Sequence, residues 1–138
     1  MKEDQWPAQF PVAQIRVARP TNQLRRVVQF YCDGIGLQVI DAFEDHKGYS
    51  GVMLGLPGHR YHLEFTQHEH GTSSQAPSRD NLLVFYIPDK EAIAKVVKRL
   101  GTLGYQPVPP ENPYWDSQGV TFEDPEGWRV VLMNTTGI

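Results

Sequence analysis

A pattern of glycine, proline and apolar residues occurs twice in this chain, and the two copies lie 68 residues apart. The matching segments are Gly36-Leu37-Gln38 with Gly104-Tyr105-Gln106, Gly51-Val52 with Gly119-Val120, and Pro57 with Pro125. Three matches at one spacing, with the same order of elements around them, indicate duplication rather than chance. A unit of this length is too long for a solenoid repeat, so the chain is expected to fold as two copies of one module.

The first copy is expected to form a strand, a helix and three further strands. Residues 11–18 alternate between an apolar and a polar side, which predicts a half-buried strand. Apolar residues at helical spacing from Leu24 to Tyr31 predict an amphipathic helix, and Gly34 and Gly36 are expected to end it. The further strands are expected at residues 37–43, 51–56 and 61–66.

The second copy begins after residues 69–80, a polar segment without periodicity that is predicted to be a linker. A helix is expected from Ala92 to Leu100, where apolar residues recur at helical spacing. Strands are expected at residues 81–87, 105–108, 118–123 and 128–133. The sequence therefore predicts an α+β fold of two tandem βαβββ modules. The predicted parts are an N-terminal arm (1–10), a first module (11–68), the linker (69–80) and a second module (81–135), with one domain over 11–135.

The composition argues against several classes of protein. A net charge of −3 lacks the basic excess of a nucleic-acid-binding protein. No run of about 18 apolar residues occurs, so no membrane span is expected. The single cysteine, Cys32, excludes an internal disulfide and a multi-cysteine zinc site. The N-terminus is polar and lacks the apolar stretch of a signal peptide, which favours a cytoplasmic location.

Two short motifs resemble those of one protein superfamily. Residues 30–37 are similar to a helix-end motif of the vicinal oxygen chelate superfamily, and residues 123–128 are similar to the turn before its last strand. This superfamily includes glyoxalase I, extradiol dioxygenases, and the fosfomycin- and bleomycin-resistance proteins. The resemblance implies that two modules form curved mixed sheets around a cleft, with the helices on the convex side. It also implies a homodimer.

The resemblance further implies where metal ligands would lie, because metal enzymes of the superfamily take them from the first and last strands of both modules. In this chain the positions fall on Val12, Glu64, Leu82 and Val131, with Asn81 beside Leu82. Only Glu64 can bind a metal, whereas a divalent first-row metal needs about three or four N, O or S ligands. We therefore expect no metal and no other cofactor.

Alternation along the strands indicates which side chains face the cleft. Leu63 and Phe65 are expected to face the helix, so that His62 and Glu64 face the cleft. The cleft residues predicted in this way are Gln14, Arg16, His62, Glu64, Val84, Tyr86, Arg129 and Val131.

Glu64 and His62 have two interpretations. An imidazole and a carboxylate on one face can act as a general-base pair, which would make both residues catalytic. Alternatively, Glu64 forms an ion pair with Arg16 or Arg129 that only holds the structure together. We favour the ion pair, because such pairs between neighbouring strands are common.

Tyr114 and Trp115 lie in a proline-rich loop rather than in a periodic element. The superfamily places this region at the border of the cleft, where these rings would stack on a planar or apolar ligand. Alternatively, they cover a sheet edge or a dimer contact.

The residues as a whole favour a protein that binds a small organic ligand in its cleft without a complete metal site. The predicted ligand-binding residues are Gln14, Arg16, Tyr86, Tyr114, Trp115 and Arg129. The two arginines favour an anionic or carbonyl-bearing ligand. The alternative is a lyase, isomerase or dioxygenase-type enzyme that uses Glu64 as base or metal ligand, because one fold hosts both enzymes and binding proteins.

Overall fold

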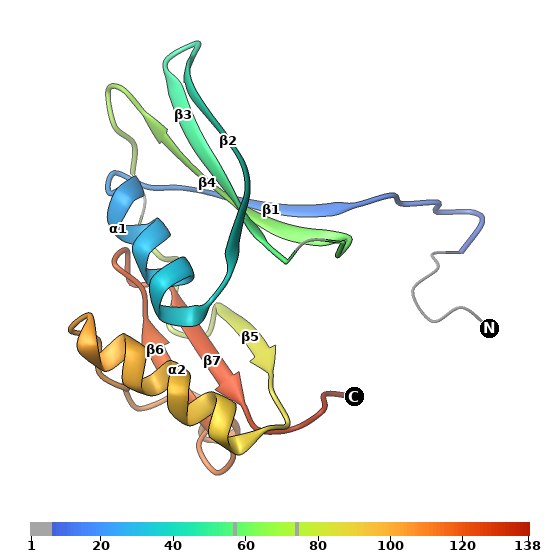
Figure 1. Ribbon diagram of the computed structural model, residues 1–138, viewed down its shortest axis with the longest axis vertical. Helices are drawn as coiled ribbons and strands as arrows, with labels where there is room; N and C mark the ends of the chain where they lie inside the picture. Colours follow the sequence, from blue (N-terminus) through green and yellow to red (C-terminus); the bar gives the residue numbers. More distant parts are fainter. Residues whose placement is uncertain (1–6, 57, 74) are drawn as a thin grey trace.

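The first module is a four-stranded mixed sheet with one helical segment on one of its faces (Figure 1). The computed structural model describes residues 7–56, 58–73 and 75–138 of the chain. The strands are β1 (Ile15–Pro20), β2 (Gln38–His46), β3 (Tyr49–Gly55) and β4 (Tyr61–His68), in the order β1-β4-β3-β2 with β1 parallel to β4. Helix α1 (Leu24–Gln29) continues as a π-helical segment, η1 (Phe30–Ile35). Gly36, at φ 111°, ends this segment as expected.

The second module repeats the order of elements but lacks one strand. Its elements are β5 (Leu82–Tyr86), α2 (Lys90–Thr102), the short 3₁₀ helix η2 (Pro113–Trp115), β6 (Gly119–Glu123) and β7 (Arg129–Met133), with sheet order β5-β7-β6. The strand predicted at residues 105–108 is wrong, because only one bridge forms there, between Val108 and Thr121. Prolines 107, 109 and 110 have no N–H to donate, which prevents a continuous ladder.

Several predicted boundaries differ from the structure. The first strand begins at Ile15 rather than at residue 11, so Val12 and Gln14 precede it. Residues 69–73 and 75–80 contain no helix or strand, and the division of the chain at this segment stays a prediction. Of the predicted arm, residues 1–6 lie outside the described residues, as does Pro57 of the repeat.

The predicted register of both modules is confirmed. Leu63 and Phe65 belong to the buried core, and Gln67 on the same side of β4 accepts a hydrogen bond from the N–H of Leu24 in α1. His62 and Glu64 therefore lie on the opposite side of the sheet, which we call the open face. In β7 of the second module the core residues are Val130 and Leu132, which leaves Arg129, Val131 and Met133 on the other side.

The two modules of the chain dock through their helix-bearing sides. The hydroxyl of Tyr31 in η1 donates a buried hydrogen bond of 2.7 Å to Oδ2 of Asp124. Oδ1 of Asp124 accepts from the N–H groups of Glu126 and Trp128, which shapes the turn before β7. Arg99 of α2 donates to the carbonyls at the end of η1. The two motifs that carry the superfamily resemblance thus contact each other and hold the modules together.

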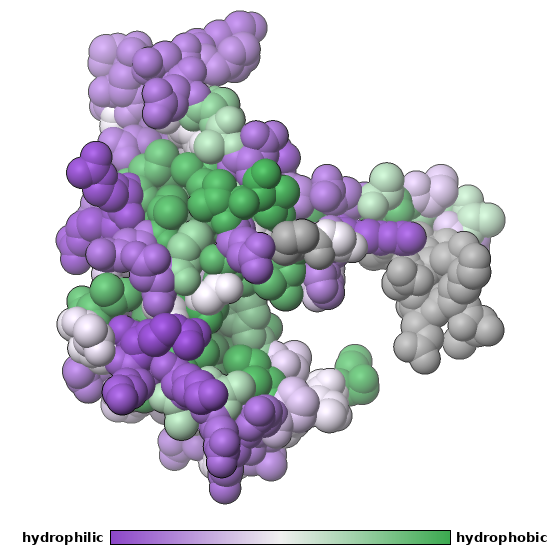
Figure 2. Space-filling model, viewed as in Figure 1, coloured by the Kyte–Doolittle hydropathy of each residue, from purple (hydrophilic) through white to green (hydrophobic). Residues whose placement is uncertain are grey.

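Several apolar side chains of the first module remain on the surface. Figure 2 shows hydrophobic surface over β2 and beside α1. The exposed apolar residues of the first sheet include Ile15, Val17, Val39, Ile40 and Tyr61. Within the described part of the chain, no helix is long and apolar enough to cross a membrane. The cytoplasmic location stays a prediction.

Candidate functional site

Arg16, His62 and Glu64 form a cluster on the open face of the first sheet. The parallel register pairs Arg16 with His62 across β1 and β4. Nε of Arg16 donates a hydrogen bond of 2.9 Å to Nε2 of His62, and Nη1 of Arg16 lies 3.5 Å from Oε2 of Glu64. The side chain of Arg16 is 44% exposed and that of Glu64 is 12% exposed. The expected pairing of Glu64 with Arg16 is therefore present.

The hydrogen bond from Arg16 determines which nitrogen of His62 carries the proton. A guanidinium can only donate, so Nε2 of His62 must accept and the proton of the neutral ring lies on Nδ1. His62 is only 7% exposed. Its Nδ1 has no hydrogen-bond partner among the residues that the structure describes. Ile40 packs close to His62, since a Cβ added to Gly55 would contact both side chains. The cluster thus contains a buried N–H donor that has no acceptor in the described part of the chain.

The donors of the cluster do not fit a divalent metal. His62 and Glu64 are the two side chains of the cluster with atoms that can bind a metal, and the guanidinium of Arg16 contacts both of them. A cation held by these two side chains would lie beside a permanent positive charge. Val12, which precedes β1, is not on the strand that the resemblance requires. No group of three or more His, Cys, Asp or Glu side chains suited to a metal occurs in the described part of the chain.

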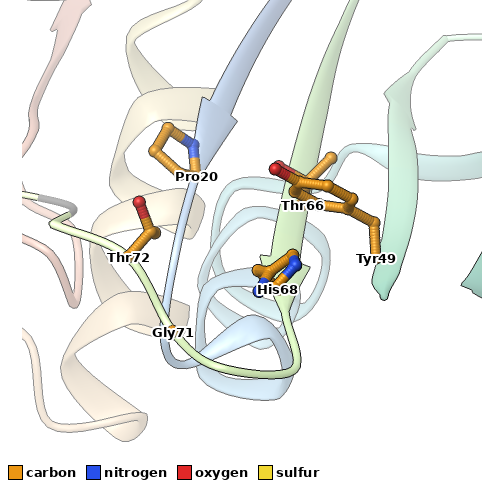
Figure 3. Close-up of a pocket in the computed structure, with 6 residues that line it drawn as sticks. All are labelled: Pro20, Tyr49, Thr66, His68, Gly71 and Thr72. Carbon is orange, nitrogen blue, oxygen red and sulfur yellow. The ribbon is translucent and has the colours of Figure 1, made fainter. Parts of the chain in front are cut away.

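A pocket continues along the same face of β4. Thr66 and His68 follow Glu64 at alternate positions of the strand and therefore share its side. The pocket is about 290 Å³, and Figure 3 shows its lining residues: Pro20, Tyr49, Thr66, His68, Gly71 and Thr72. The ring of Tyr49 meets the imidazole of His68 edge-on at 4.6 Å between centroids.

Sequence reasoning missed part of this pocket. Gly71 and Thr72 lie in the predicted linker, where no periodicity indicates a direction for any side chain. Pro20 shares the alternation of Arg16 and Ala18, but the predicted strand ended at residue 18. Continuing the alternation by one step would have found Pro20.

Arg129 is not part of the cluster. Its side chain is 4% exposed, with Nη2 at 3.1 Å from Oε2 of Glu123. Nη1 donates a hydrogen bond of 2.8 Å to the carbonyl of Pro109. Arg129 therefore holds the proline-rich segment against the second sheet, and its charge is balanced by Glu123. Of the two arginines predicted to meet a ligand, only Arg16 is accessible.

The other predicted ligand-binding residues lie elsewhere. Tyr86 is half exposed on β5 and its ring lies near Gly137. Tyr114 is exposed and packs edge-on against Trp115, with 4.9 Å between ring centroids. Gln14 is exposed just before β1. The structure thus brings together Arg16, His62 and Glu64, and it places Tyr86, Tyr114 and Trp115 in the second module.

Comparisons with known proteins agree with this fold. Family models described as the YycE-like N-terminal domain and the YycE-like C-terminal domain match residues 15–66 and 80–134. The uncharacterized protein YycE of Bacillus subtilis is 53% identical over 129 residues, which are 94% of this chain and 93% of that protein. A crystal structure of a YycE protein of unknown function from Bacillus subtilis has a TM-score of 0.91 and 50% identity, and the match covers 98% of both chains.

More distant solved structures share the fold alone. The fosfomycin resistance protein FosX of Mesorhizobium loti has a TM-score of 0.67 at 16% identity, over 88% of this chain and 90% of that one. The trypanothione-dependent glyoxalase I of Leishmania major has a TM-score of 0.65 at 21% identity, over 86% of this chain and 84% of that one. The expected vicinal oxygen chelate fold is thereby confirmed.

Proposed function

Because this chain belongs to the YycE-like family, we propose that it binds a small organic ligand at the open face of its first sheet without a divalent metal. The observation that carries the proposal is the position of Arg16. Its guanidinium contacts both His62 and Glu64, the side chains that would otherwise be free to hold a cation. The adjoining pocket of about 290 Å³ offers room for a small molecule.

The purified protein is expected to contain far less than one equivalent of zinc, nickel, manganese or iron, as measured by elemental analysis. His62 and Glu64 supply too few ligands to hold a divalent metal tightly, and the neighbouring charge of Arg16 would repel the metal. The Arg16→His variant is the matched test, since it would replace the charge with a third donor beside His62 and Glu64. We expect that variant to bind Zn²⁺ in a calorimetric titration in which the unaltered protein shows no binding.

The alternative is an enzyme that uses Glu64 as base or metal ligand. It is supported by the remaining exposure of Glu64, which faces the same side as the pocket. Near-stoichiometric metal in the unaltered protein that is lost in Glu64→Ala would favour this alternative and contradict the metal-independent proposal.

We further propose that the protein is a homodimer in which a second copy covers the exposed apolar residues of the first sheet. Support comes from Val17 and Val39, large apolar side chains exposed on the edge strands β1 and β2. Leaving such side chains in water is unfavourable by about 25 cal/mol per Å². Val17 pairs with Leu63 and Val39 pairs with Leu54, so both lie on the helix-bearing side of the sheet, and their exposure shows that the second module of the same chain does not cover them.

Light scattering is expected to give twice the chain mass of 15.7 kDa. Val17→Glu would place a charge on the exposed apolar surface and is expected to shift the protein toward the monomer. Lys95→Glu, a charge change on the exposed side of α2, is the control and should stay dimeric. A monomer for the unaltered protein would contradict the dimer.

A further inference from the structure

We propose that the guanidinium of Arg16 is the anchor for an anionic oxygen group, such as a carboxylate, phosphate or phosphonate, on the ligand of this site. The inference rests on the proposed ligand-binding function and adds the charge of the ligand to it. The basis of the inference is that Arg16 and Arg129, which were predicted to face one cleft, have different surroundings in the structure. Arg129 is buried and paired with Glu123, whereas Arg16 is exposed at the pocket's side of the sheet.

Arg16 is held in place but still has donors to offer. A guanidinium carries five N–H donors in a planar fork that matches carboxylate and phosphate oxygens. Its Nε is used by His62, and Nη1 lies near Glu64. Within the described residues, no hydrogen bond from Nη2 is present, and the side chain is nearly half exposed. The two existing contacts fix the orientation of the fork, so less conformational entropy is lost when an anion binds.

The contact with Glu64 does not satisfy Arg16. At 3.5 Å, the separation of Nη1 and Oε2 is longer than the 2.7–2.9 Å of a charge-assisted hydrogen bond. An incoming oxyanion can therefore form stronger bonds to the fork than Glu64 does. A cationic group would instead meet the guanidinium before it reached Glu64, which disfavours cationic ligands here.

His62 supplies a second donor. Its Nδ1–H is buried and has no partner among the described residues, and an unpaired buried donor is costly. The hydrogen bond from Arg16 keeps this ring in the tautomer that donates from Nδ1. Because Nε2 of His62 faces Arg16, its Nδ1–H points to the other side of the ring, so this donor would bond a second oxygen of the ligand rather than the one held by Arg16. The pocket at Thr66 and Thr72 lies farther along the same face, beyond Glu64, and would hold the distal part of a longer ligand.

The test is an NMR titration of the His62 imidazole, assigned from the spectrum of His62→Asn. The probes are benzoate and methylphosphonate, with benzamide as the neutral analogue of benzoate. We expect benzoate and methylphosphonate to shift the His62 signals in a saturable manner, and benzamide to bind about 10-fold more weakly or worse. Arg16→Gln should weaken benzoate binding by about 10-fold or more, and Arg16→Lys by less, because lysine retains the charge.

The control variant is Arg25→Gln, which removes an exposed arginine from α1 and should leave benzoate affinity unchanged. If benzamide binds as well as benzoate and Arg16→Gln has no effect, the anion inference fails while ligand binding stands. If neither anion perturbs His62 at tens of millimolar, the inference is overturned. If Zn²⁺ binds stoichiometrically to the unaltered protein, the proposed metal-independent function fails, and the anion inference that rests on it fails with it.

Discussion

Replacing Asp124 with alanine is expected to lower the free energy of unfolding by about 3–5 kcal/mol. Asp124 is buried, and its carboxylate accepts hydrogen bonds from the Tyr31 hydroxyl and from two backbone N–H groups of the following turn. Alanine would leave all three donors without an acceptor at the contact between the modules. Urea unfolding of the two proteins, followed by circular dichroism, measures the difference.

Asp124→Asn is the matched control. An amide oxygen can still accept from the N–H groups of Glu126 and Trp128, and the amide nitrogen can donate to the Tyr31 oxygen. We expect Asp124→Asn to retain most of the stability at pH 7. Equal losses for Asn and Ala would contradict the assigned hydrogen bonds, because loss of the carboxylate charge would then account for the effect.

The same pair of proteins should reveal a pH dependence. Burial raises the pKa of the Asp124 carboxyl above its ordinary value of 3.8, although hydrogen bonds from Tyr31 and the turn act in the opposite direction. The folded state therefore binds this proton more tightly than the unfolded state does. The resulting stabilisation is fully present below pH 3.8 and is lost as the pH rises through the folded pKa. The stability of the unaltered protein relative to Asp124→Asn should fall over that interval, and a constant difference would contradict the shift.

Replacing Gly34 with alanine is expected to destabilise the protein by about 1–3 kcal/mol. Gly34 lies in η1, where a Cβ would overlap Cδ2 of Leu100 and come within 3.5 Å of Cδ1 of Leu103. Leu100 is fully buried in the core shared by the two modules, so it cannot move away without displacing its neighbours. Thermal and urea unfolding of Gly34→Ala measure this cost.

Gly101→Ala is the control for glycine removal from a helix. Gly101 lies in α2, and a Cβ there would come no closer than 4.0 Å to its nearest neighbour, Nε2 of Gln106. Alanine at this helical position should stabilise the protein by about 0.5–1 kcal/mol. If Gly34→Ala leaves the free energy of unfolding unchanged while Gly101→Ala raises it, the modules pack less tightly around Gly34 than described.

Much of the framework was predictable from the sequence because its signals are local. The alternation of Leu63 and Phe65 with His62 and Glu64 established both the strand and the direction of each side chain, and the core confirms it. The glycine before β2 ended the helical segment at the expected place. The strand at residues 105–108 failed where prolines removed the donors of a ladder, a local signal that the apolar pattern obscured.

The sequence by itself determined the duplication, the order of elements and the face on which His62 and Glu64 lie, since these depend on spacing within short segments. Only the tertiary structure decided which charges meet. Arg16 and His62 are 46 residues apart, and the parallel register of β1 and β4 brings them together. Arg129 lies on the face that the sequence predicted, yet the carbonyl of Pro109 and the carboxylate of Glu123 occupy its guanidinium. Contacts between distant segments depend on how strands pair and how loops fold back. The periodicity of a short segment indicates neither.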